Sequence, residues 1–96
     1  MSRLRNLARG RQCQVRVPLC CNGNEETVVL AHYRMATLSG MGIKSPDWCG
    51  AWACSDCHRA IDSGSANYTR PELNLMHAEG VFRTLAILER EGQKLW

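Results

Sequence analysis

Six cysteines, at positions 13, 20, 21, 49, 54 and 57, are the residues whose type and spacing most directly suggest chemistry. Cys54-Ser-Asp-Cys57 is a Cys-x-x-Cys turn, which presents two sulfur atoms to one tetrahedral metal ion. A second pair lies upstream, formed by Cys13 with Cys20 or Cys21. Four thiolates would complete a closed structural zinc site, and a chain of 96 residues has too small a core to be stable easily without one.

The choice between Cys20 and Cys21 stays open at the level of sequence. Cys21 is favoured because it lies directly on the Asn22-Gly23 turn, where backbone amides can point at a thiolate. The predicted zinc ligands are therefore Cys13, Cys21, Cys54 and Cys57. An alternative gives the fourth position to Cys49 or His58. A thioredoxin-like redox role is less favoured, because nothing nearby resembles a βαβ unit.

Metal binding is expected rather than disulfide formation, because the chain has the features of a cytoplasmic protein. Its first residues, MSRLRNLARGRQ, are basic but no apolar run follows them, so no signal peptide is expected. No stretch approaches the roughly 18 apolar residues that a membrane span needs. In a reducing compartment, close cysteine pairs are typical of metal sites.

Two histidines form a second candidate site. His32 ends an apolar run, and His58 directly follows a cysteine of the Cys-x-x-Cys turn. Asp62 shares a helix face with His58 if this segment is helical. A histidine and a carboxylate on one face, beside a strand-end histidine, can bind a divalent cation and leave positions open for water and phosphate. His77 lies apart from these candidates in the sequence, and we interpret it as a packing or surface residue.

Two strands and a short helix are expected to position these side chains. The β-branched, apolar segment 27–32 predicts a buried strand, and the apolar run 48–53 predicts a second strand that pairs with it. Residues 55–62 predict the short helix. Glycine and proline predict a loop over 35–47, and the alternation within 13–18 is typical of a strand.

A long amphipathic helix is predicted after these elements. Thr69 and Glu72 have the spacing of a capping box, and apolar residues recur at helical spacing from Arg70 to about Arg90. Gly80 weakens this helix by about 1 kcal/mol relative to alanine, so we expect it to serve close packing. The chain is thus predicted to be one α+β domain, 1–96, with a basic arm over 1–12, a strand–strand–helix unit over 13–64 and a helix over 69–92.

The N-terminal segment is strongly basic, although the whole chain carries a net charge of only +3. Its positive residues, all before the first acidic residue, are Arg3, Arg5, Arg9, Arg11 and Arg16. Such an arm favours a polyanion and gives a salt-dependent attraction that is independent of sequence. DNA is therefore the expected partner. The alternative is a solvated segment, either a frayed helix or a mobile arm.

The order of these features resembles the HNH, or ββα-metal, endonucleases. A strand that ends at His32, a loop, a second strand and then Cys54-x-x-Cys57-His58 follow the order of that superfamily, and in many members two cysteine pairs bind zinc and hold the ββα unit together. More narrowly, Ala-His32-Tyr-Arg and Cys-Ser-Asp-Cys-His-Arg-Ala-Ile-Asp62 look like the YbcO-type nucleases of phages and prophages. That similarity runs from the Arg-Gly-Arg-Gln-Cys13 segment to the C-terminal helix.

The resemblance implies a metal-dependent endonuclease that hydrolyses phosphodiester bonds in phage DNA recombination, repair or packaging, in the cytoplasm of a bacterial host. His32 would be the general base that deprotonates the attacking water, and His58 would bind the catalytic Mg²⁺ or Mn²⁺ with Asp62 as a second ligand. From its position two residues beyond His32, Arg34 could bind a phosphate, and the alternative is an ordinary surface charge. The implied fold is a small zinc-bound ββα-metal (HNH) unit with a long C-terminal amphipathic helix.

Two departures from the HNH pattern leave alternatives open. No asparagine lies between His32 and His58, and we expect Asp47 to take its part by orienting His32. Ala31 stands where many relatives carry an acidic metal ligand, so fewer protein groups would bind the catalytic metal. The second hypothesis is therefore a catalytically inactive, zinc-bound nucleic-acid-binding module. The third is a protein-interaction adaptor whose C-terminal helix binds a partner, with a homodimer as one form of such association.

Overall fold

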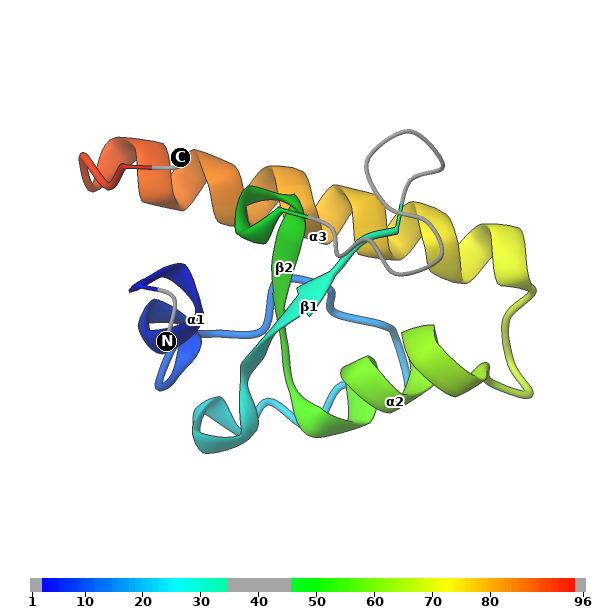
Figure 1. Cartoon of the computed structure of the whole chain (residues 1–96). Helices are drawn as coiled ribbons and strands as arrows, with labels where there is room; N and C mark the ends of the chain where they lie inside the picture. Colours follow the sequence, from blue (N-terminus) through cyan, green and yellow to red (C-terminus); the bar gives the residue numbers. More distant parts are fainter. Residues whose placement is uncertain (1–2, 35–45, 95–96) are drawn as a thin grey trace.

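The computed structural model describes residues 3–34 and 46–94. Its elements in chain order are α1 (Arg3–Ala8), the 3₁₀ helix η1 (Glu25–Thr27), β1 (Val29–His32), the 3₁₀ helix η2 (Asp47–Cys49), β2 (Gly50–Ala53), α2 (Ser55–Ser63) and α3 (Arg70–Arg90). Figure 1 shows the two strands lying between α3 on one side and α2 on the other. The predicted α+β order of two strands, a short helix and a long C-terminal helix is confirmed.

The strands pair antiparallel, with Val29 opposite Ala53 and His32 opposite Gly50. Both strands start later than predicted, because 3₁₀ turns replace the first residues of the predicted ranges 27–32 and 48–53. Asn24 caps η1 by accepting a hydrogen bond from the amide of Glu26, and η2 follows Pro46. The loop predicted over 35–47 lies outside the described residues from 35 to 45.

The strand predicted over 13–18 is wrong. Arg16 has a φ of 53°, and this left-handed conformation interrupts an extended backbone. The segment instead lies against β2 and α3. The amide of Gln14 donates to the carbonyl of Trp52 at 2.7 Å, and Arg83 Nε donates to the carbonyl of Gln14 at 2.8 Å.

The long helix α3 begins and packs as predicted. Thr69 and Glu72 form the reciprocal hydrogen bonds of a capping box. At Gly80 the helix approaches its neighbours so closely that an added Cβ would lie 3.0 Å from Val15 Cγ2 and 3.2 Å from Ala51 Cβ. The predicted role of Gly80 in close packing is therefore confirmed.

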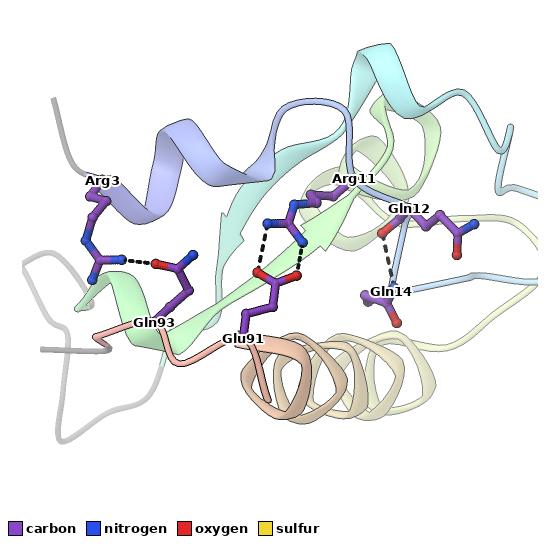
Figure 2. Close-up of polar contacts among 6 residues, drawn as sticks. All are labelled: Arg3, Arg11, Gln12, Gln14, Glu91 and Gln93. Carbon is purple, nitrogen blue, oxygen red and sulfur yellow. Dashed lines mark hydrogen bonds and ion pairs between the residues drawn. The ribbon is translucent and has the colours of Figure 1, made fainter. Parts of the chain in front are cut away.

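The basic N-terminal segment is folded against the rest of the protein. Leu4 and Ala8 of α1 are buried. Figure 2 shows Arg3 bonded to Gln93 and Arg11 paired with Glu91, so both ends of this segment contact the residues that directly follow α3. The alternative of a mobile arm over 1–12 is therefore wrong for its described part. Within the described ranges, every helix is too short or too polar to span a membrane.

Candidate functional site

The structure gathers four cysteines into one cluster. The sulfur atoms of Cys13, Cys21, Cys54 and Cys57, the four predicted ligands, all lie within 4.8 Å of one another and could hold a metal ion. Cys20 belongs to a different contact, with its Sγ 3.8 Å from Ser65 Oγ. His58, an alternative fourth ligand, has its Nε2 3.6 Å from Asp62 Oδ2 instead.

Backbone amides surround the sulfur atoms of this cysteine cluster. The amide of Arg16 donates to Cys13 Sγ at 3.5 Å, and the amide of Val17 donates to Cys57 Sγ at 3.4 Å. Cys54 is the N-cap of α2, and its Sγ accepts a hydrogen bond from the amide of Cys57 at 3.4 Å. The left-handed turn at Arg16 thus directs two consecutive amides toward sulfur, and this explains why residues 13–18 do not extend.

The cluster favours one negative charge and resists a second. A hydrogen bond from Cys57 lowers the pKa of Cys13 to about 4. The same bond is the largest cause that raises the pKa of Cys57, and burial is the second largest. Burial also raises the pKa of Cys21, and the backbone amide of Gly23 opposes this shift, as expected from the Asn22-Gly23 turn. A divalent cation favours the deprotonated form of all its thiol ligands, so metal binding and thiol deprotonation are linked in this cluster.

His32 meets a carboxylate at the end of β1. Its Nε2 lies 2.7 Å from Asp47 Oδ1. Because a carboxylate accepts but does not donate, Nε2 must carry the proton, and the lone pair then lies on Nδ1. The His32 side chain is 25% exposed, so water can reach it. Arg34, two residues further on, is exposed.

Arg5 also reaches this carboxylate, which sequence reasoning did not predict. Its Nε lies 3.3 Å from Asp47 Oδ1, the same oxygen that accepts from His32. Arg5 lies in α1, and 42 positions separate it from Asp47. No local pattern predicts a contact over that distance. Arg5 and Arg11 therefore both pair with carboxylates that follow them far along the chain.

His58 and Asp62 lie one turn apart on α2. The distance from His58 Nε2 to Asp62 Oδ2 is 3.6 Å, and the side chains are 43% and 71% exposed. Both side chains are therefore accessible to water. Since His58 directly follows Cys57, the position of the cysteine cluster determines the position of the His58–Asp62 pair.

His77 lies beside the candidate site although it is distant from the other candidates in the sequence, and its interpretation as a packing residue is confirmed because its side chain is buried. Its Nε2 donates to the carbonyl of Ala31 at 2.8 Å. The pKa of His77 is lowered, first by burial, and the charges of His58 and His32 act in the same direction. Asp62 and the Ala31 carbonyl oppose the shift. His32, His58 and Asp62 are therefore all close enough to His77 for their charges to affect its pKa.

Helical phase is the sequence pattern that could have indicated the position of His77. It lies on the buried stripe of α3, between Leu73 and Thr84. Its ring also contacts the ring of Tyr33 edge-on, with centroids 5.1 Å apart. His77 thus contacts the residues on both sides of His32 in the chain.

The fold and the site define a class of small α+β proteins with a cysteine cluster beside a histidine–carboxylate pair. The model of the family described as "Putative nuclease YbcO" matches residues 2–93. The chain is 47% identical over 92 residues to "Putative nuclease YbcO" of Escherichia coli (strain K12), with 96% of both chains covered. It therefore belongs to this family.

Two further comparisons agree with this assignment. "Putative nuclease ybcO" of Enterobacteria phage 82 is also 47% identical over 92 residues, with 96% of each chain covered. A solved structure described as "Structure of a putative bacteriophage protein from Escherichia coli str. K-12 substr. MG1655" superimposes with a TM-score of 0.77 at 43% identity. That match covers 92% of this chain and 98% of the other.

Proposed function

We propose that this protein is a metal-dependent DNA endonuclease of the HNH type. The observation that carries the proposal is the 2.7 Å contact between His32 Nε2 and Asp47 Oδ1. It gives His32 a free Nδ1 lone pair at the end of β1, as a general base requires. His32 would take a proton from the water that attacks the scissile phosphate, and Asp47 would stabilise the resulting imidazolium. Membership of a family named for nucleases supports the same reaction class.

His58 and Asp62 are the residues we propose as ligands of the catalytic divalent cation. A nitrogen and an oxygen 3.6 Å apart on one helix face fit two positions around a single Mg²⁺ or Mn²⁺ ion. When bound, such an ion polarises the scissile phosphate and stabilises the leaving oxygen. Ala31 contributes no carboxylate, so water and phosphate oxygens are expected to fill the remaining coordination positions.

The cysteine cluster, Cys13, Cys21, Cys54 and Cys57, is proposed to bind structural zinc. Four sulfur ligands leave no open position, so this ion would stabilise the fold and take no part in hydrolysis. Three of the four cysteines are buried, as expected of a closed site. Thiolates and imidazoles thus have separate proposed roles.

DNA binding is proposed to involve the basic residues of the N-terminal segment together with Arg34. Arg9 and Arg34 are both exposed. Contacts of this kind with phosphate make affinity fall as salt rises. The relatives from a phage and from Escherichia coli favour action on phage DNA during recombination, repair or packaging in the cytoplasm of the host.

Plasmid nicking tests the proposed nuclease activity. Supercoiled plasmid is incubated with the wild-type protein, His32→Ala or Asn74→Ala, with Mg²⁺, Mn²⁺ or no added cation. Asn74 is exposed on α3 and serves as a purification-matched control. We expect cation-dependent nicking by the wild type and Asn74→Ala, and a loss of about 100-fold or more in His32→Ala. Equal nicking by all three proteins would mean that His32 is not the base.

The second candidate function is nucleic-acid binding without catalysis. One observation favours it: over residues 3–34 and 46–94, the cysteine cluster is the one group of three or more possible ligands close enough to share a metal. Among the described residues, the proposed catalytic cation thus has two candidate ligands, His58 and Asp62, which is few for a catalytic metal site. Salt-dependent DNA binding without nicking in any divalent cation would support this second function.

A further inference from the structure

The carboxylate that holds His32 is itself held by a second donor. Asp47 Oδ1 lies 2.7 Å from His32 Nε2 and 3.3 Å from Arg5 Nε. The Asp47 side chain is only 23% exposed, whereas that of Arg5 is 45% exposed. Arg5 is thus the more exposed of the two donors, since the His32 side chain is 25% exposed.

Helix α1 presents Arg5 from a fixed position. Leu4, next to Arg5, is 6% exposed, and Ala8, about one turn further on, is fully buried. Arg3 bonds to Gln93, and Arg11 forms a two-bond ion pair with Glu91, with its second bond at 2.9 Å (Figure 2). Contacts before and after Arg5 thus hold this segment against the residues that directly follow α3.

A guanidinium in this position affects the proton on His32. It is a permanent cation, so it attracts the Asp47 carboxylate and restricts the directions in which that carboxylate can turn. When the carboxylate is ionised and correctly directed, it accepts a hydrogen bond from the His32 ring through Nε2–H. If it turns away, the neutral imidazole can also adopt the Nδ1–H tautomer, and Nδ1 then has no lone pair for a water proton.

We propose that Arg5 is a positioning residue for the general base, acting through Asp47 to hold His32 in the Nε2–H tautomer. The effect of Arg5 on the rate of hydrolysis rests on the proposed nuclease function, whereas its effect on the His32 tautomer does not. The role differs from the contact with DNA phosphates that the basic N-terminal segment suggests. Arg5 therefore belongs to a three-residue chain that joins α1 to the end of β1.

The test compares Arg5→Ala and Arg5→Lys with Arg9→Ala. Arg9 lies just after α1 and is exposed, so Arg9→Ala removes the same charge without touching Asp47. Nicking kinetics give kcat and KM, and ¹⁵N imidazole correlation spectra of the full-length protein report the tautomer of His32. We expect Arg5→Ala to lower kcat about 3–10-fold, while Arg9→Ala raises KM and leaves kcat unchanged.

The spectra separate this proposal from the nuclease proposal. Arg5→Ala should convert His32 from the Nε2–H form to a mixture of tautomers, and Arg5→Lys, which keeps the charge, should restore part of the original population. A tautomer change in a protein without nicking activity would support the role of Arg5 and overturn the nuclease proposal alone. An unchanged His32 spectrum, with a KM effect equal to that of Arg9→Ala, would overturn the role of Arg5. If Arg5→Ala does not fold, Arg5→Gln gives the same two outcomes.

Discussion

Replacing Asp47 with alanine removes the carboxylate that is proposed to orient His32 and leaves every proposed metal ligand in place. A hydrogen bond to a charged group contributes about 1.5–3 kcal/mol in proteins. The side chains of His32 and Asp47 are 25% and 23% exposed, so partial solvation reduces the contribution. We expect a loss of about 1–2 kcal/mol of transition-state stabilisation, after allowing for solvent screening. Because 1.36 kcal/mol corresponds to tenfold in rate, kcat should fall about 5–30-fold.

Single-turnover nicking at saturating Mn²⁺ is the assay for Asp47→Ala, because it separates the chemical step from product release. Asp47→Asn is the matched variant. Its amide oxygen can still accept a hydrogen bond from His32 Nε2, but it carries no charge, so its rate should lie between those of the wild type and Asp47→Ala. Substrate affinity should not fall in either variant, since both remove negative charge from a surface proposed to bind DNA.

A double-mutant cycle decides whether Asp47 acts through His32. In a His32→Ala background, Asp47→Ala should produce little further loss, because the group that it orients is already absent. An equal fold-loss in both backgrounds would refute the reasoning and show that the carboxylate acts independently of the imidazole. The zinc content and unfolding midpoint of each variant are measured alongside, so that a rate change is not confused with unfolding.

Three further substitutions test the fold that supports the site. In Cys57→Ser we expect metal analysis to find no zinc, whereas Cys49→Ser, outside the cluster, should keep one zinc ion. Cys57→Ser should also lose cooperative unfolding. A structural zinc site contributes about 10 kcal/mol or more, and the total free energy of unfolding of a small domain is only about 5–15 kcal/mol. Gly80→Ala should destabilise the protein by about 1–3 kcal/mol in urea despite the higher helix propensity of alanine, since its Cβ would lie 3.0 Å from Val15, and a more stable variant would contradict this. Because the pKa of His77 is lowered in the folded protein, the unfolded chain takes up a proton at this residue first as pH falls. The contribution of neutral His77 to stability is therefore complete above the ordinary pKa of 6.5 and is lost as pH falls below it. His77→Gln should reduce the pH dependence of the free energy of unfolding, measured in urea between about pH 5 and 7, relative to the wild type.

Local patterns in the sequence predicted the elements that local interactions determine. The capping box of Thr69 and Glu72 involves residues in one turn, and the Cys54-Ser-Asp-Cys57 spacing encodes its own turn at the start of α2. The choice of Cys21 over Cys20 was also local, because the amide of Gly23 lies next to it. In each case the contacting groups are close in the chain, so spacing alone indicates them.

Contacts between distant segments were not predictable in this way. The left-handed φ of Arg16 is unusual for a residue with a side chain, and it occurs where amides must point at the sulfurs of a cluster drawn from separate segments. Likewise, His77 reaches Ala31 across 46 positions. Spacing within one segment carries no information about which other segment lies beside it.

The two proposed halves of the catalytic site are held by different parts of the protein. His58 directly follows Cys57 on α2, so the cysteine cluster determines its position. His32 depends on the pairing of β1 with β2 and on the chain from Arg5 to Asp47. Substitution of Arg5 or Asp47 should therefore impair the base and leave both the fold and divalent-cation binding at His58 intact, whereas loss of the proposed structural ion should unfold the domain that supports both halves. A base that fails alone, without loss of the fold or of cation binding, is what a division of roles between thiolates and imidazoles requires.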